Sequence, residues 1–341
     1  MVNLFNRPTP LVKPKLLVVE LWGMGDLIIA TPFLQAASKK YQVTLLAKPY
    51  AQDLQSRFWP EVKVLPFVAP WTAFENKYHL FSWPWRQIFK LRSQLAAERF
   101  EFGLSARWDP RDHFLLTIAR ARTRLGFPRL RSQMFLSRAL LRPEPKAHRY
   151  ENWRVMAQAL DFQLPERENL IMLSNRSSRE ILVHTGAGQP VRVWPLERYR
   201  VIVTRLRGRK IPVQVACDPD QQDWWLQAGE TNIATPRSVG ELFSLIQRAG
   251  AFIGNDSGPG HLAAFSGIPT LTIFGPQLPD WFAPLHPASQ VIPGKACPYK
   301  PCSDYCQLPT AVCMVNSSEE EVWKRIETFI DRALPASSIP N

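Results

Sequence analysis

A glycine-dense loop near residue 255 has the residue types that bind a diphosphate. The run GNDSGPGHLAA at 254–264 follows an apolar segment, 251–254, that predicts a strand. The loop would then begin a helix, and the unpaired amides of a helix N-terminus bind phosphate groups without a metal ion. His261, one turn into that helix, would add a hydrogen bond to the ligand. The residues predicted to contact the diphosphate are Asp256, Ser257, Gly258 and His261.

A second glycine-rich loop follows the apolar run at 180–184. It reads GAG at 186–188, and Arg192 comes shortly after it. Backbone N–H groups exposed in such a loop bind an anion, and a fixed cation nearby neutralises its charge. No Gly-Lys-Ser/Thr follows, so the loop is not a P-loop. We predict that Gly186, Ala187 and Gly188 contact the anion and that Arg192 neutralises it.

Asp26 is a candidate general base. It directly follows Gly23-Met24-Gly25 at the end of an apolar run, and ligands of parallel α/β sheets bind where strands end at their carboxyl side. A dinucleotide loop would need a third glycine and an acidic residue after the second strand, but the chain has Ile28 and Lys48 there. The alternative role of Asp26 is to cap the following helix, and one side chain can do both.

Two features could indicate a metal site, but neither has the usual pattern. Asp218-Pro219-Asp220 is an Asp-x-Asp sequence, yet it follows a predicted strand at 212–216, where a turn is expected. Four of the five cysteines lie within 17 residues, and their spacing differs from the paired Cys-x-x-Cys of zinc modules. These cysteines are Cys297, Cys302, Cys306 and Cys313. We predict reduced structural thiols, no metal and no cofactor.

The elements that would position these residues form two α/β halves. Lys15–Glu20 and Gln42–Ala47 are apolar runs that predict parallel strands, joined by a helix over 27–39. In the second half, short apolar runs at 180–184, 212–216, 232–234, 251–254 and 270–274 alternate with helical patterns such as 239–249. A capping signal opens a last helix at 318–333. The predicted domains are 1–165 and 179–341, joined by a linker over 166–178.

An aromatic, proline-rich segment at 57–89 fits neither a regular helix nor a regular strand. It carries four of the twelve tryptophans. A segment of this composition can rest on a lipid interface beside a basic surface. It can also pack as core beneath a loop, and both interpretations stay open.

The net charge of +13 lies entirely in the first half of the chain. Residues 1–165 contain 25 Lys and Arg against 12 Asp and Glu, whereas residues 166–341 contain 17 of each. A one-sided basic surface indicates an anionic partner, although it can also serve solubility. Arginine dominates between 120 and 154, and its planar fork suits phosphate and carboxylate. The residues predicted to bind an anionic acceptor are Arg120, Arg124, Arg129 and Arg131.

The first fifteen residues lack the apolar core of a signal peptide, and no run of about 20 apolar residues occurs. We therefore expect a cytoplasmic protein that can still touch a membrane surface.

Taken in order, these motifs resemble glycosyltransferase family 9, the ADP-heptose:lipopolysaccharide heptosyltransferases. The resemblance rests on GMGD near the start, GAG with R-x-WP-x-E-R-Y in the middle, NDSGPGHLAA and FGP later, and the cysteine-containing run at 300–314. It implies a GT-B fold, in which two Rossmann-like α/β domains face each other across a cleft. The N-terminal domain would bind the acceptor and the C-terminal domain the nucleotide sugar.

The resemblance also implies roles for single residues. Asp26 matches the family's base, residues 256–261 match its nucleotide-diphosphate loop, and Arg237 falls where the family borders the nucleotide base. Arg192 stands where the family usually has lysine, which keeps the positive charge and adds a forked donor. The run CDPDQ at 217–221 replaces a Gly-Gly-Pro-x-Glu turn, so the acidic residue near the nucleotide is displaced.

The implied function is an inverting transfer of heptose or a related sugar from a nucleotide diphosphate, ADP-heptose in the family. The acceptor would be a lipopolysaccharide-core-like or other anionic lipid-linked glycan. Asp26 would take the acceptor proton, and Arg192 with the amides at 257–258 would stabilise the leaving diphosphate. The alternatives are a non-catalytic nucleotide-sugar-binding protein at the membrane, a sugar-nucleotide epimerase and a nucleic-acid binder. No nucleic-acid partner is predicted, because no recognition module is visible.

Overall fold

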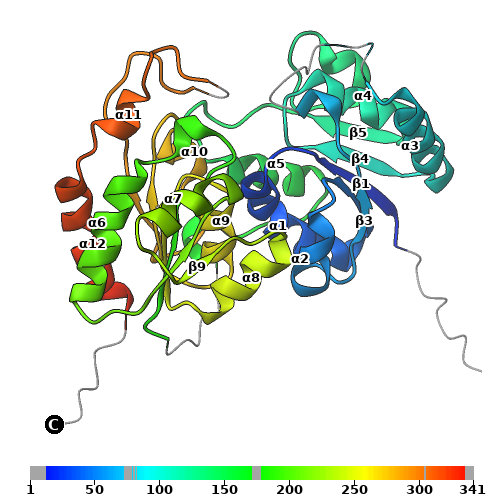
Figure 1. Cartoon of the computed structure of the whole chain (residues 1–341). Helices are drawn as coiled ribbons and strands as arrows, with labels where there is room; N and C mark the ends of the chain where they lie inside the picture. Colours follow the sequence, from blue (N-terminus) through cyan, green and yellow to red (C-terminus); the bar gives the residue numbers. More distant parts are fainter. Residues whose placement is uncertain are drawn as a thin grey trace, which may run out of the picture. The chain divides into compact units, whose positions relative to one another are not determined.

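The chain forms two units, each built on one six-stranded sheet (Figure 1). The computed structural model describes residues 13–72, 79, 81, 83–170, 178–302 and 305–334. Unit 1 comprises Met1–Leu21, Pro32–Arg142 and Arg154–Phe162. Unit 2 comprises Trp22–Thr31, Pro143–Trp153 and Gln163–Asn341. The stretch that carries Asp26 therefore packs with unit 2, although the strand before it belongs to unit 1.

All strands of unit 1 are parallel, in the order β3-β2-β1-β4-β5-β6. They are β1 (Lys15–Glu20), β2 (Gln42–Ala47), β3 (Lys63–Pro66), β4 (Phe102–Ser105), β5 (Thr123–Gly126) and β6 (Arg138–Ala139). The first two have the predicted bounds. Both are continuous apolar runs, as expected for strands covered by helices on both faces.

The sheet of unit 2 is also parallel and has the order β12-β11-β10-β7-β8-β9. Its strands are β7 (Ile181–His184), β8 (Val213–Ala216), β9 (Ile233–Ala234), β10 (Ala251–Asn255), β11 (Thr270–Ile273) and β12 (Gln290–Ile292). Both sheets thus have the doubly wound 3-2-1-4-5-6 connectivity. In such sheets a ligand binds where the strand order reverses, which is between β7 and β10 in unit 2.

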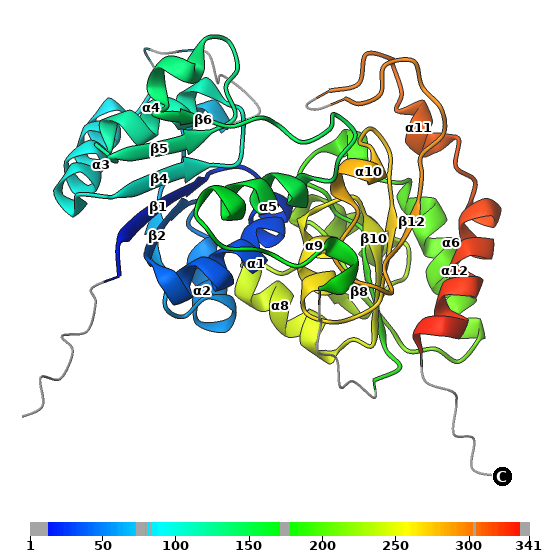
Figure 2. The same cartoon turned by 180° about the vertical axis from the view of Figure 1, so that it is seen from behind.

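Helices connect the strands and cover the sheets. They are α1 (Met24–Lys40), α2 (Ala51–Phe58), α3 (Trp85–Glu98), α4 (Pro110–Ile118), α5 (Arg149–Ala159), α6 (Leu196–Gly208), α7 (Gln222–Gln227), α8 (Val239–Arg248), α9 (Gly258–Phe265), α10 (Pro279–Phe282), α11 (Val312–Val315) and α12 (Glu319–Ala333). The predicted capping signal is present, since the Ser318 and Glu321 side chains each bond the other's backbone N–H. In Figure 2, α8 and α9 lie side by side.

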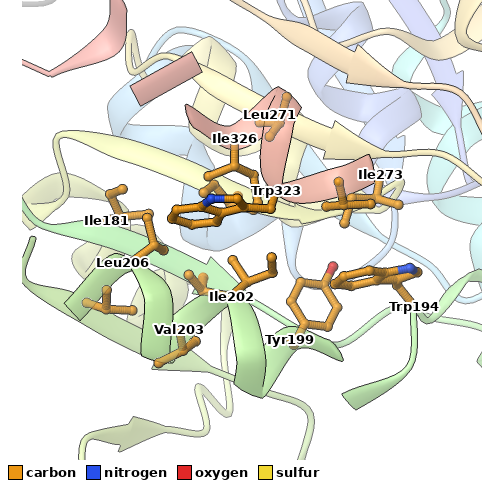
Figure 3. Close-up of a cluster of buried hydrophobic side chains, with 14 of the residues drawn as sticks. Ile181, Trp194, Tyr199, Ile202, Val203, Leu206, Leu271, Ile273, Trp323 and Ile326 are labelled. Carbon is orange, nitrogen blue, oxygen red and sulfur yellow. The ribbon is translucent and has the colours of Figure 1, made fainter. Parts of the chain in front are cut away.

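The core of unit 2 joins the sheet to α6 and α12. Figure 3 shows Trp323 of α12 among aliphatic side chains of α6 and the sheet, including Ile202 and Leu271. Trp194 and Tyr199 extend this core toward the carboxyl ends of the strands, with ring centroids 5.0 Å apart. The loop that carries Arg192 is therefore held by buried aromatic side chains.

Two predictions about local structure were wrong. The helix expected from residue 27 begins at Met24, because the glycine turn forms its first turn. The segment 57–89 is more regular than expected, since it contains β3, which pairs with β2, and the start of α3. Residues 73–78, 80 and 82 of that segment lie outside the described residues.

Candidate functional site

Asn255, the last residue of β10, forms hydrogen bonds that join three loops of unit 2. Its Oδ1 accepts hydrogen bonds from Trp194 N at 3.0 Å and from Tyr199 Oη at 2.9 Å. Its Nδ2 donates to Thr185 O at 2.8 Å. The side chain is fully buried, so each bond lies in a low dielectric where it resists exchange with water. The loops after β7 and β10 and the Arg192 loop are thereby fixed relative to one another.

The N-terminus of α9 lies next to Asn255 and the three loops that it joins. Ser257 has the extended backbone of an N-cap residue, and Pro259 occupies the first turn, where its missing N–H costs nothing. Gly260 N donates to Ser257 O at 3.2 Å, whereas the amides of Ser257 and Gly258 have no acceptor within the helix. A β-carbon at Gly258 would stand 2.8 Å from Met24 Cβ, so the start of α1 packs directly on the start of α9. This helix end can bind an anion.

The buried Asp256 and the half-buried Arg192 form a loose ion pair beside that helix end. Arg192 Nη1 lies 3.6 Å from Asp256 Oδ2, which is an ion pair but not a hydrogen bond. Among the described residues, neither Asp256 Oδ2 nor Arg192 Nε has a hydrogen-bond partner. Burial raises the pKa of the Asp256 carboxyl to about 6; Arg192 acts to lower it and Asp26 to raise it further. The unused donor of this pair is Arg192 Nε, from which an oxygen of a bound diphosphate could accept a hydrogen bond.

Asp26 and His261 complete the cluster. Asp26 is the third residue of α1, and its Oδ2 accepts a hydrogen bond from Gly23 N at 3.1 Å, which is half of a capping box. The capping role considered for Asp26 is therefore present, in the third position of the helix. Burial lowers the pKa of the His261 imidazole to about 4, although Asp26 opposes this. His261 is thus neutral at pH 7, and its buried Nδ1 has no hydrogen-bond partner among the described residues.

The predicted GAG loop is partly occupied by the protein's own carboxylate. Asp218, after β8, packs against Gly186 and accepts a hydrogen bond from the backbone N–H of Ala187. That amide is therefore already engaged. At Gly188, in contrast, no described residue other than its two chain neighbours comes within 4 Å of where a β-carbon would stand. Burial raises the pKa of Asp218, and the nearby Asp220 raises it further. Asp218, the first residue of the Asp-x-Asp sequence, thus holds the loop at 186–188 in place.

Arg237 lies at the edge of this arrangement. It is exposed, and its backbone N–H donates to Glu241 Oε2 at 2.8 Å in the first turn of α8. It follows β9, which is three strand positions from β10 in the sheet, or roughly 14 Å at the usual strand spacing. Arg237 therefore lies away from the N-terminus of α9, at a distance that the far end of a nucleotide could reach if its phosphates bound at that helix end.

The four predicted acceptor arginines, all in unit 1, do not form one group. Arg120 precedes β5, whereas Arg129 and Arg131 follow it, and the four-residue strand between them spans roughly 13 Å. The guanidinium of Arg124 is held by the protein, because its Nε donates to Phe135 O at 2.8 Å and its Nη1 to Ala121 O at 3.0 Å. Only Arg129 and Arg131 are exposed at the carboxyl end of the strand, where α/β sheets bind ligands.

In the part of the chain that the structure describes, no group of three or more His, Cys, Asp and Glu side chains is placed to hold a metal ion. The same part has no helix that is both long and apolar enough to cross a lipid bilayer. All five cysteines are free thiols.

Sequence reasoning missed Asn255 and Met24 as parts of the site. Asn255 stands within the quoted loop motif, and its position as the last residue of a buried strand could have indicated a structural amide. Met24 gave no signal, because its contact with Gly258 depends on how α1 packs.

Comparison with known proteins matches the chain to one family. A family model described as glycosyltransferase family 9 (heptosyltransferase) matches residues 88–310. Over 170 residues the chain is 33% identical to lipopolysaccharide heptosyltransferase 1 of Pseudomonas aeruginosa. That alignment covers 46% of this chain and 47% of the relative, so the chain spans about half the length of this curated protein.

Solved structures resemble the chain over nearly its whole length. E. coli heptosyltransferase WaaC with ADP has a TM-score of 0.71 at 18% identity, covering 92% of this chain and 99% of that one. A glycosyl transferase family 9 structure from Veillonella parvula has a TM-score of 0.70 at 18% identity, covering 94% and 98%. These likenesses confirm the predicted GT-B fold with its two Rossmann-like sheets.

Proposed function

The chain belongs to glycosyltransferase family 9, and from that membership we propose that it transfers a heptose or related sugar from a nucleotide diphosphate, ADP-heptose first among the candidates. The proposed acceptor is a hydroxyl group of a lipopolysaccharide-core-like or other anionic lipid-linked glycan. The observation that carries the proposal is the convergence of Asp26, Arg192, Asp256 and His261 at the N-terminus of α9.

The diphosphate of the donor would bind at the start of α9. Its negative charge suits the free amides of the helix end and the guanidinium of Arg192. Arg192 Nε lacks an acceptor among the described residues, and its ion pair with Asp256 is long, so phosphate oxygens can bind it without breaking a strong bond. The same groups would stabilise the charge that develops on the diphosphate as the sugar leaves.

Asp26 is the proposed general base. The attacking acceptor hydroxyl would give its proton to the Asp26 carboxylate, form the new bond to the anomeric carbon, and displace the diphosphate from the opposite face. Asp256 is less suited to this role despite its raised pKa, because it is 3% exposed and paired with Arg192. Asp26 is half-buried, so a substrate can reach it.

The neutral His261 would position groups rather than carry a charge. Its ring lies against Gly25, one residue before Asp26, so it fixes the turn that presents the base. Neutral imidazole can also donate one hydrogen bond to a phosphate oxygen. Both actions follow from burial of the ring, which keeps it unprotonated at pH 7.

For the acceptor side, the exposed Arg129 and Arg131 are the proposed contacts with acidic groups of the glycan. Peripheral contact with the inner membrane, on its cytoplasmic face, would accompany a lipid-linked acceptor.

The test is a transfer assay with ADP-heptose and a heptose-deficient lipopolysaccharide acceptor, read as acceptor-dependent release of ADP and a mass increase of the glycan. Donors with UDP, GDP and CDP serve as comparisons. Transfer from ADP-heptose supports the proposal. Donor binding without transfer to any acceptor would instead favour a non-catalytic nucleotide-sugar-binding protein.

A further inference from the structure

His113 on α4 is fully buried in unit 1 and joins two loops by hydrogen bonds. Its Nε2 lies 3.1 Å from Arg107 O, in the loop after β4. Its Nδ1 lies 2.9 Å from Ser132 Oγ, in the loop after β5. The two strands are neighbours in the parallel sheet, and α4 lies beside β5 (Figure 2). One imidazole therefore connects two loops at the carboxyl end of the sheet, where ligands of such sheets bind.

The direction of each bond follows from the chemistry of the groups. A carbonyl oxygen only accepts, so His113 Nε2 carries a proton and donates to Arg107 O. Burial lowers the pKa of His113, although the bond to Arg107 and the nearby Asp109 oppose this, so the ring is neutral at pH 7. Nδ1 is then unprotonated and accepts from the hydroxyl of Ser132. The hydroxyl oxygen of Ser132 can still accept a bond from a second group.

That second group is the backbone of Arg129. Arg129 N donates to Ser132 Oγ at 2.9 Å, and Ser132 N donates back to Arg129 O at 3.0 Å. The residues between them, Leu130 and Arg131, have φ values of 50° and 65°, in the left-handed region. Residues with a β-carbon adopt this region only where the surrounding structure holds them. The bonds of Ser132 therefore stabilise an unfavourable backbone conformation over residues 129–132.

Burial of side chains does not account for this conformation. Leu130 is 78% exposed, and Arg129 and Arg131 are exposed as well. What the fixed backbone determines is the direction in which the two arginine side chains leave the loop. Binding groups that are held before the ligand arrives lose less entropy when it binds.

The imidazole is itself held in place. A β-carbon at Gly126, the last residue of β5, would stand 2.6 Å from His113 Nε2, so the ring packs directly on the strand. Thr117 on α4 donates to Phe135 O at 3.2 Å, and the rings of Phe114 and Phe135 pack edge-on with centroids 5.5 Å apart. The helix that carries His113 is thus fixed against both β5 and the turn that follows the 129–132 loop.

We propose that His113 is a positioning residue for acceptor binding. Through the hydroxyl of Ser132 it holds the 129–132 loop so that Arg129 and Arg131 meet the anionic groups of the glycan. His113 itself does not contact the acceptor. The proposal rests on the proposed function, which supplies that acceptor.

The first experiment measures binding of a deacylated oligosaccharide from heptose-deficient lipopolysaccharide by titration calorimetry. Ser132→Ala should bind it at least about fivefold more weakly, the factor that corresponds to one hydrogen bond. Ser137→Ala is the matched control, because Ser137 Oγ also accepts from a backbone N–H, that of Arg124 at 2.7 Å, outside the loop. It should bind like wild type.

Two substitutions of His113 separate its two bonds. The amide of asparagine reaches the position of Nδ1, so His113→Asn keeps an acceptor for Ser132, whereas the amide of glutamine reaches the position of Nε2 and keeps a donor for Arg107. We expect His113→Gln to bind the glycan as weakly as Ser132→Ala, and His113→Asn to stay within about twofold of wild type. Affinity for the donor nucleotide should be unchanged in all these variants.

Trypsin reports the state of the loop without any ligand. It cleaves after arginine, and a backbone that is held in place resists cleavage. Ser132→Ala and His113→Gln should be cut after Arg129 and Arg131 at least about fivefold faster than wild type, while other sites are cut at the wild-type rate. Mass spectrometry of the early fragments measures this.

The proposal is overturned if Ser132→Ala binds the glycan like wild type, whatever its rate of cleavage. It is also overturned if His113→Asn and His113→Gln weaken binding equally, or if wild type does not bind the glycan. Should a substitution of His113 prevent folding, the comparison of Ser132→Ala with Ser137→Ala still decides. Wild-type binding of the glycan without sugar transfer would instead contradict the proposed function alone.

Discussion

The imidazole of His261 lies on the backbone of Gly25, so closely that a β-carbon at position 25 would stand 2.7 Å from His261 Cδ2. The contact joins the start of α1, which carries the proposed base, to α9, which carries the proposed phosphate site. The position of the start of α1 relative to α9 therefore depends on position 25 being a glycine.

Gly25→Ala should impair catalysis. In a helix, alanine is normally more stable than glycine by roughly 0.5–1 kcal/mol, but here the methyl group must displace the buried imidazole. We expect kcat/KM to fall at least about tenfold, with the secondary structure retained. Gly208→Ala, a helical glycine with open space around it, is the control and should keep wild-type kinetics. Wild-type kinetics in Gly25→Ala would show that the contact does not position the base.

Removing the Asn255 side chain should cost more stability than removing one of its partners. Asn255→Ala leaves Trp194 N and Tyr199 Oη without their bonds in a buried place and removes one of the two bonds to Thr185 O, which should cost about 3 kcal/mol or more. Tyr199→Phe removes only one of these bonds and should cost about 1 kcal/mol. Urea unfolding monitored by tryptophan fluorescence measures both. Equal losses would mean that Asn255 does not join the three loops.

Acid should destabilise the fold through buried histidines. His148 is an example: burial lowers its pKa to about 3, and its Nε2 donates to Ala283 O at 2.9 Å. The unfolded chain binds a proton near the ordinary pKa while the folded chain does not, so stability is lost as pH falls below about 6.5. Between pH 7 and 5 this histidine should account for about 2 kcal/mol.

Urea unfolding at the two pH values checks the prediction. His148→Gln, which keeps a donor but cannot titrate, should lose less stability on acidification than wild type. An identical loss in both proteins would assign the acid sensitivity to other groups.

The prediction for acceptor binding compares the arginines at the two ends of β5. R129E/R131E should raise the acceptor KM several-fold and flatten its rise with ionic strength, because exposed charge pairs are screened over about 8 Å at physiological salt. Arg120→Glu changes an exposed arginine at the other end of the strand and should do neither. The donor KM should stay constant in both. Equal effects at the two ends would indicate a diffuse attraction rather than a binding site.

Much of the fold could be predicted because its strands are continuous apolar runs. β1 and β2 have the predicted bounds, and the loop motifs after β7 and β10 lie together because both strands end at the point where the sheet order reverses. Parallel topology alone brings such loops together.

The remainder depends on tertiary packing, which local pattern does not encode. β3 is only four residues long and includes lysine and proline, so its pairing with β2 decides its conformation. The run of arginines from 120 includes the residues of β5, and this strand places Arg120 at one end and Arg129 and Arg131 at the other. The carboxylate of Asp218 reaches Ala187 only because β7 and β8 are neighbours in the sheet.

The most direct test of the account is the turnover of Asp26→Asn, measured beside its affinity for the donor nucleotide. Asparagine keeps an oxygen that can accept the bond from Gly23 N, so the helix start should persist. We predict nearly unchanged nucleotide binding and a kcat lowered by at least about 10²-fold, as for loss of a general base. A kcat within about threefold of wild type would contradict the assignment and remove Asp26 from the reaction.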